Sequence, residues 1–249
     1  MHLAAQVYAK VQSMQMELDG AFESASSLEA AARAWNDAVY APLAQALVLA
    51  RVFAILPRAA LPSLAAEHAD RIAGATGQSL DARSPVLTLL ASRGTRREWN
   101  ERLRSQLHLA MPLASSAFVS SSPMIASLLD DLGVRLTSVS WGPRLVSTAR
   151  EVPEYPTFYI PDALTSTDAR GRLKVPGRAF VMANDVKTVF GVGGSLTGGA
   201  LFVMILFARQ HVTRAVAEQL VPLAADFRAA AVPIAARGAF FDARSASDS

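Results

Sequence analysis

The chain has 249 residues, of which 51% are hydrophobic and 18% are charged, and it contains no cysteine. This length suits one large domain or two small ones and allows a sizeable core. The absence of cysteine excludes a disulfide framework, a thiolate nucleophile, an iron–sulfur cluster and a cysteine-based zinc site, and the net charge of +3 is mild.

Two helices are predicted at the start of the chain. Apolar residues at intervals of three and four predict an amphipathic helix from Leu3 to about Phe22. Ser26 and Glu29 have the spacing of a capping box, in which Ser26 bonds forward and Glu29 reaches back. This box predicts a second helix that runs through Trp35 toward Tyr40.

If the first helix continues past Gly20, one heptad seam runs through both segments. A seam of this kind packs either within the core of the monomer or against a second copy of the chain, and the spacing leaves both interpretations open. We expect a homodimer formed through the terminal helices. The seam residues are Val7, Val11, Met14, Leu18, Ala21, Ala25, Leu28, Ala32 and Trp35.

Two apolar runs predict buried strands at Leu47–Pro57 and Pro85–Ala91. A short helix is predicted between them, around Leu64–Ala73. Arg93 and Gly94 are expected to form the turn that follows the second strand. The first half of the chain therefore alternates helices with strands that have the composition of a sheet interior.

Two helix starts follow the second strand. Residues Thr95–Glu98 form another capping box, which predicts a helix that passes through Leu107 and stops before Pro112. Ser122 followed by Pro123 is a second helix start, and Gly133 is its C-terminal stop. We therefore expect one helix directly after the second strand and another over residues 123–132.

The second half of the chain predicts short strands and one long helix. The last two strands form a hairpin across the Gly-rich link of residues 193–199. The final helix spans about Val212–Ile234, and Pro222 should bend or break it. The predicted strands are Thr157–Ile160, Ala179–Met182, Lys187–Val192 and Leu201–Ala208.

Four blocks of sequence carry a family resemblance: PVLTLLASRG, LAMPLASSAFVSSSPMIASLLDDLGV, FYIPDA, and VFGVGGSLTGGALFVMILFAR. Together with the order of elements, they resemble the GAF-like region found upstream of bacterial histidine kinases, over about residues 28–231. The resemblance implies an α+β fold in which helices flank a central antiparallel sheet, with long N- and C-terminal helices. It also implies a signal-input or regulatory module rather than an enzyme.

This resemblance suggests a division of the chain into three parts. Residues 1–26 are an N-terminal helix that could mediate dimerisation, residues 27–234 are the GAF-like domain including the C-terminal helix, and residues 235–249 are a flexible tail. No kinase, receiver or DNA-binding segment is apparent. We therefore expect the protein to signal through a partner, such as a histidine kinase or another signalling protein.

The candidate ligand-binding residues centre on His108. It ends a predicted helix near Trp99 and Met111, where, by the resemblance, some GAF-like sensors place a pocket-lining or haem-ligating residue; the alternative is a structural or surface histidine. A pocket against the sheet would also draw on aromatic side chains. The candidate set is Trp99, His108, Met111, Trp141, Tyr159 and Phe190, and the sequence does not identify the ligand or any cofactor.

Known catalytic motifs are missing from the sequence. The glycine cluster lacks the Gly-Lys-Ser/Thr ending of a P-loop, and Leu196 stands where a dinucleotide fingerprint needs its third glycine. No two histidines have the spacing of a metal-binding helix, and the lack of cysteine excludes the thiol-dependent methionine sulfoxide reductases that share the GAF-like fold. We expect a non-catalytic protein without a metal site.

Two other functions stay open. An enzyme of unassigned chemistry would need His108, Tyr159 and Asp162 in one shared cavity, whereas a degenerate GAF-like scaffold would have a filled interior. The basic residues between Arg93 and Arg104 are interrupted by acidic ones, which favours a solvated helix face over a nucleic-acid site.

A cytoplasmic location is expected from two features. The longest apolar run, Ala200–Ala208, is about half of the roughly 20 residues that a membrane-spanning helix needs. The first 20 residues interrupt their apolar positions with Gln, Lys and Glu, unlike a signal peptide. We therefore expect no membrane partner.

Overall fold

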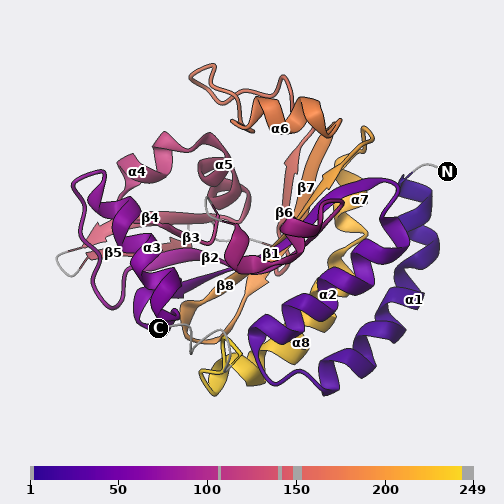
Figure 1. The fold of residues 1–249 in the computed structure, drawn as a ribbon, viewed down its shortest axis with the longest axis horizontal. Coiled ribbons are helices and arrows are strands. Elements are labelled where there is room, and N and C mark those ends of the chain that lie inside the picture. The colour runs from indigo at the N-terminus through magenta and orange to yellow at the C-terminus, as the bar shows by residue number, and fades with distance from the viewer. Residues whose placement is uncertain (1–2, 106–107, 140–141, 148–152, 243–249) are drawn as a thin grey trace.

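A six-stranded antiparallel sheet forms the centre of the computed structural model, which describes residues 3–105, 108–139, 142–147 and 153–242. The strands follow the order β3-β2-β1-β8-β7-β6, and helices cover both faces (Figure 1). This arrangement confirms the predicted α+β fold. The strands are β1 Leu47–Pro57, β2 Pro85–Gly94, β3 Ala110–Pro112, β6 Thr157–Ile160, β7 Thr188–Ser195 and β8 Leu201–Ala208.

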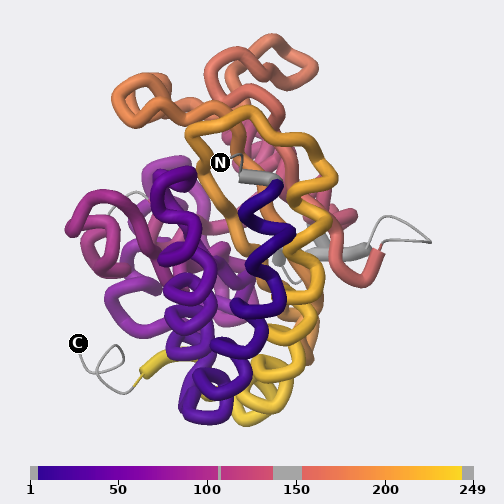
Figure 2. Tube along the Cα trace, turned by 90° about the vertical axis from the view of Figure 1, so that its right-hand side faces the viewer, coloured from indigo at the N-terminus to yellow at the C-terminus, as the bar shows by residue number. Residues whose placement is uncertain are grey.

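Three long helices cover one face of the sheet: α1 Leu3–Glu23, α2 Leu28–Leu43 and α8 Val221–Ala236. Helices α2 and α8 contact the strands, and α1 packs on their outer side, where it lies in front of both in Figure 2. Large apolar side chains fill the space beneath them. The rings of Phe202 on β8 and Phe227 on α8 lie 5.0 Å apart, and both residues are fully buried.

The seam residues on α1 and α2 pack within the core of the monomer. Helix α1 ends at Glu23, and the chain reverses before α2, so a single continuous helix does not form. Met14 and Leu18 on α1 and Trp35 on α2 have at most 1% of their surface exposed, all within one core cluster. The interpretation of the seam as core packing is therefore confirmed, and Leu18 is unavailable to a second chain.

Helix α2 begins one residue later than the predicted cap. Ser27, rather than Ser26, is the N-cap, and its Oγ accepts a hydrogen bond from the N–H of Ala30 (2.9 Å). The carboxylate of Glu29, which was expected to reach back to the cap, pairs with Arg102 (3.3 Å) and accepts a hydrogen bond from the N–H of Asp242 (3.1 Å). These partners lie far away in the sequence.

The C-terminal segment packs on the start of α2. The carbonyls of Ala239 and Phe240 accept hydrogen bonds from the N–H groups of Leu28 and Glu29, at 2.9 and 3.0 Å. These two donors lie in the first turn of α2, where a helix has no internal acceptors. The flexible tail was predicted to begin at residue 235, but α8 continues to Ala236 and residues 237–242 pack on the start of α2. Residues 243–249 lie outside the described part.

The opposite face of the sheet carries shorter elements. Helix α5 (Pro123–Asp131) packs against it between the predicted cap and Gly133, whose φ of +65° confirms the predicted stop. The other elements of this half are α3 Ser63–Gly74, α4 Ser116–Ser121, α6 Arg178–Ala183, α7 Arg214–Glu218, and the two-stranded ladder of β4 Val134–Val139 with β5 Gly142–Ser147.

Two predicted elements were wrong. The helix expected after Thr95 is replaced by two 3₁₀ turns, Arg97–Asn100 and Arg102–Arg104, followed by β3. The side chain of Asn100 accepts the backbone N–H of Gly94 (2.8 Å), and such bonds compete with a regular helix. The strand expected at 179–182 is instead the helix α6.

The break predicted at Pro222 is confirmed, because α7 ends at Glu218 and Pro222 opens α8. The Gly-rich link differs from the prediction. Gly191, Gly193 and Gly194 lie inside β7, and only Gly198 and Gly199, with positive φ, form the turn of the hairpin.

A substitution of Gly191 tests the close approach of β7 and β8. A Cβ at this position would lie 1.8 Å from the carbonyl oxygen of Met204, whereas a Cβ at Gly20 in α1 meets nothing within 4 Å. We predict that Gly191→Ala lowers the free energy of unfolding by about 3 kcal/mol or more, and that Gly20→Ala raises it by about 0.5–1 kcal/mol. Urea denaturation measures both, and a neutral Gly191→Ala variant would contradict the strand packing.

Candidate functional site

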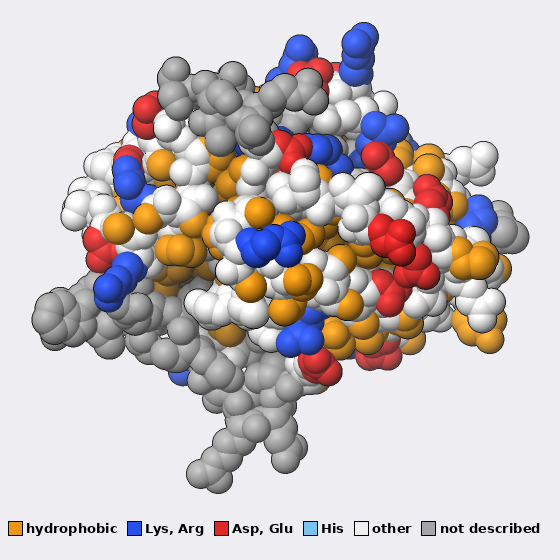
Figure 3. Space-filling view, turned by 90° about the horizontal axis from the view of Figure 1, so that it is seen from below, with side chains coloured by type: hydrophobic (Ala, Val, Ile, Leu, Met, Phe, Trp, Pro, Cys, Tyr) orange, Lys and Arg blue, Asp and Glu red, His pale blue; other side chains and the backbone are white. Residues whose placement is uncertain are grey.

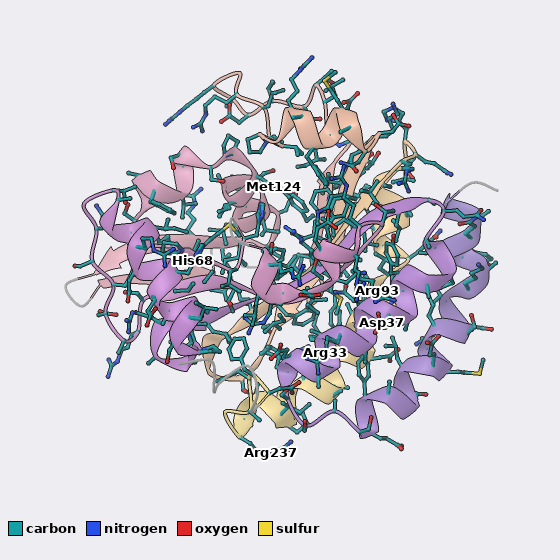
Figure 4. The ribbon with its side chains drawn as sticks, viewed as in Figure 1. Arg33, Asp37, His68, Arg93, Met124 and Arg237 are labelled. Atoms are coloured by element: carbon teal, nitrogen blue, oxygen red, sulfur yellow. The ribbon has the colours of Figure 1, made fainter. Side chains whose placement is uncertain are left out.

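A cavity of about 570 Å³ lies on the second face of the sheet. Its floor is formed by strands β1, β2 and β8, and its walls come from α5, α6 and the segment that begins with the 3₁₀ turns. Met124, labelled in Figure 4, contributes from α5. The lining residues used below are Leu49, Arg51, Phe53, Leu87, Glu98, Trp99, Arg104, Ser105, His108, Met111, Met124, Phe180, Ile205 and Phe207.

The alternation of β1 places Arg51 in the cavity floor. Leu49, Arg51 and Phe53 project from the same face because side chains alternate along a strand, and all three line the cavity. Arg51 lies opposite Ser92 of β2 and Ile205 of β8. It is 8% exposed, so a cation is embedded in a strand whose first ten residues are all buried.

Three aromatic rings form one wall. Trp99 lies 5.5 Å from Phe180, which lies 5.7 Å from Phe207, and both pairs pack edge to face. The guanidinium of Arg96 lies over the Trp99 ring, 5.2 Å from its centroid. The Arg96 side chain is half exposed. This wall is apolar, and it suits contact with rings or hydrocarbon.

The polar end of the cavity is built around Arg51. Its Nη2 donates a hydrogen bond to Ser105 Oγ (3.1 Å), and its Nε is buried with no partner among the described residues. Burial lowers the pKa of Arg51 to about 10, so the guanidinium stays charged at neutral pH. Desolvation at the cavity lining, and to a lesser extent the charge of Arg51, lowers the pKa of His108 to about 4, although the residue keeps an exposed surface. The imidazole is therefore neutral at pH 7.

The structure separates the predicted site residues. Trp99, His108 and Met111 line the cavity together. Tyr159 and Phe190 are cross-strand partners in β6 and β7 that pack with the helical layer on the other face, and the Tyr159 hydroxyl donates to the carbonyl of Val212 (2.7 Å). Trp141 lies outside the described residues.

The shared cavity required by the enzyme alternative does not form. His108 lines the cavity, but Tyr159 and Asp162 do not. Asp162 acts in a turn, where its Oδ1 accepts the N–H groups of Leu164 (2.8 Å) and Thr165 (2.9 Å). Within the described residues, no cluster of three His, Asp or Glu side chains could hold a metal ion, and no helix is long and apolar enough to span a membrane.

Most of the basic cluster is solvated, as predicted, because Arg93, Arg96, Arg97 and Arg104 are exposed, but these residues lie on the end of β2, the following turn and the 3₁₀ turns rather than on a helix. Arg102 is 7% exposed, Arg104 lines the cavity, and Arg93 pairs with Asp37 of α2 at 3.2 Å, as Figure 4 allows the reader to follow. On the face shown in Figure 3, acidic and basic side chains are interspersed. The charges on that face are therefore mixed in sign rather than gathered into a broad field of one sign.

Sequence reasoning missed Arg51, Ser105 and Arg104. Arg51 had a detectable signal, because it is the single charged residue within the apolar run Leu47–Pro57, and a charge in a buried strand needs a partner or a function. Ser105 and Arg104 had none, since their positions depend on a segment that was predicted to be helical.

Comparison with known proteins finds similarity in structure. The phycoerythrobilin-bound GAF domain from a cyanobacterial phytochrome has 12% sequence identity and a TM-score of 0.47. The phycocyanobilin-bound GAF domain from a cyanobacterial phytochrome has 13% identity and a TM-score of 0.46. Each alignment covers 91% of this chain and 96% of the other. No protein-family model and no curated protein matches the chain.

The central sheet and its flanking helices follow the order of elements that was predicted from the sequence. A long N-terminal helical segment leads into the central strand β1, and the final hairpin β7–β8 leads into the C-terminal helix α8, as the resemblance implied. The bilins are ligands of those two proteins and are not assigned to this chain.

The environment of His108 generates a pH prediction. Arg51, Arg104 and Glu98 are the charged groups that line the same cavity. Titration by NMR should give His108 a pKa of about 4, well below the ordinary value of about 6.5. Because the folded-state pKa is depressed, stability from this group is present above about pH 6.5 and is lost as the pH falls toward 4.

The Arg51→Met variant separates the two causes of the lowered His108 pKa, which are desolvation and the charge of Arg51. Removal of the charge should raise the pKa of His108, whereas the contribution of burial should persist. A pKa of 6.5 or higher for His108 in the unsubstituted protein would contradict its placement in this cavity.

Proposed function

We propose that this protein is a ligand-binding sensory or regulatory protein without catalytic activity, and that the cavity on the second face of the sheet is its ligand site. The observation that carries the proposal is the cavity itself. Its volume of about 570 Å³ falls within the range of roughly 300–1,000 Å³ typical of small-molecule sites, and apolar walls with a few convergent polar groups are typical of them. A scaffold with a filled interior is not supported.

A signal could leave the cavity through Arg102. This residue lies in the second 3₁₀ turn, between the cavity-lining Trp99 and Ser105. Its side chain points away toward the helical layer, where Nε donates to Glu29 of α2 (3.3 Å) and the guanidinium lies 5.1 Å from the ring centre of Phe241. One short segment therefore contacts both the ligand site and the docked C-terminal segment.

The contacts around Glu29 join the start of α2 to the C-terminal segment. Glu29 also pairs with Arg33 (3.5 Å), and Arg33 pairs with Asp242 (2.5 Å). Asp242 in turn accepts a hydrogen bond from the hydroxyl of Ser27 (2.5 Å). A ligand acts only through a difference in affinity between two arrangements, and we propose docking and release of residues 237–242 as these arrangements.

The output partner stays a prediction, whether it is a second copy of the chain, a histidine kinase or another signalling protein. The structure changes which residues of α1 are available to it. Leu18 is fully buried, whereas Tyr8 and Met16 are 79% and 71% exposed. Light scattering of a Tyr8→Glu/Met16→Glu variant is therefore a sharper test of dimerisation than substitution of the seam. The cytoplasmic location also remains an expectation.

A cavity-filling substitution tests the ligand site. Met124→Trp places a larger side chain in the cavity, and Leu64→Trp makes a related change on α3, outside the cavity. In a thermal-shift screen of small molecules, we expect ligands that raise the melting temperature of the unsubstituted protein to lose at least tenfold in affinity with Met124→Trp and to be unchanged with Leu64→Trp. Ligands that bind a folded Met124→Trp variant normally would contradict the assignment.

Hydrogen exchange tests the route through Arg102. Arg102→Met leaves the buried Glu29 with fewer partners, which destabilises its surroundings. We expect the amides of Leu28 and Glu29, which are held by the docked segment, to exchange several-fold faster. Arg96→Met, a change on an exposed side chain in the same region, is the matched control. Unchanged exchange in Arg102→Met would show that Arg102 does not hold the segment.

A further inference from the structure

We propose that the ligand of this cavity is an amphipathic organic anion: a mainly apolar body with one anionic group that is bound by Arg51. This inference rests on the proposed function of the cavity as a ligand site, and it adds the chemical class of the ligand. It is carried by the geometry and the pairing of charged groups around Arg51.

First, Arg51 is a buried cation without an ion-pair partner among the described residues. The side chain is more than nine-tenths buried and borders the cavity. Among the described residues it has no carboxylate within ion-pair distance, and its one hydrogen-bond partner is the neutral hydroxyl of Ser105. A buried charge is unfavourable unless a counter-charge or several hydrogen bonds compensate it.

The second step is that the other charged lining groups have partners of their own. Glu98 lies 4.0 Å from Arg96, and Arg104 pairs with Glu101. His108 is neutral at pH 7 because its pKa is about 4, so it can offer a hydrogen bond but no charge. The cavity therefore presents one uncompensated positive charge, on a group whose planar fork binds carboxylate-like anions in a bidentate manner.

The third step concerns the body of the ligand. Most of the remaining lining is apolar: Leu, Ile, Met, Val and Phe side chains and the edge-to-face wall of Trp99, Phe180 and Phe207. The polar residues that line the cavity besides Arg51 are Glu98, Arg104, Ser105, His108 and Ser122. Multiply charged or strongly hydrated molecules would lose their water here without replacement. A ligand with an apolar body would pack against this wall, and its single anionic group would pair with the guanidinium of Arg51.

A pair of related dyes tests the inference. Anilinonaphthalene sulfonate has an aromatic body and one anionic group, and N-phenylnaphthylamine is the same body without the sulfonate. Fluorescence titration of the full chain should show at least tenfold tighter binding of the anionic dye. In Arg51→Met this preference should disappear through loss of affinity for the anionic dye, while affinity for the neutral dye stays within about twofold.

The melting temperature of Arg51→Met supplies a second readout. If Arg51 is an unpaired buried charge kept for a ligand, an apolar side chain of similar length should leave the melting temperature unchanged or raise it. An Arg51 with a purely structural role predicts a clear decrease. If Arg51→Met does not fold, Arg51→Gln, which removes the charge and keeps a donor for Ser105, must show the same loss of preference.

The outcomes distinguish this inference from the proposed function. Equal binding of both dyes, lost in Met124→Trp, would overturn the anion inference and leave the cavity as a ligand site. Binding of both dyes that is insensitive to Met124→Trp would count against the cavity itself. A preference for the anionic dye that survives both Arg51→Met and Arg51→Gln would also overturn the role of Arg51.

Discussion

Burial of β1 on both faces is the constraint on which the rest of the structure depends. All ten residues from Leu47 to Leu56 are buried, so both faces of the sheet centre need a cover. Helices α2 and α8, with α1 packed on their outer side, cover one face, and side chains such as Trp35 of α2 and Phe227 of α8 fill it. The second face is covered by shorter elements that leave the cavity open, and the one charged residue of β1, Arg51, projects from this face.

The two faces are not independent. The segment of 3₁₀ turns that closes one side of the cavity also passes the edge of the sheet, where Arg102 reaches Glu29 at the start of α2. The same few residues receive the docked C-terminal segment through the carbonyls of Ala239 and Phe240. The segment that lines the cavity therefore also contacts the place where the start of α2 meets the C-terminal segment.

Local patterns predicted most of the fold, because β1, β8 and α5 are specified by apolar runs and caps within their own sequence. The failures lie where distant contacts decide the structure. Asn100 and Arg102 bond to Gly94 and Glu29 instead of continuing a helix. In the site, Trp99 and Met111 were found from their proximity to His108, but the face occupied by Tyr159 is set by its pairing with β7, which the sequence does not reveal.

The central claim is that the second face of β1 carries a cavity for an anionic ligand at Arg51. A crystal structure of the full chain at high resolution tests it most directly. We expect an open cavity with an anionic group, from a ligand or from the solution, at hydrogen-bond distance of about 3 Å from the Arg51 guanidinium. A cavity filled by protein side chains, with Arg51 paired to a carboxylate of the chain itself, would contradict it.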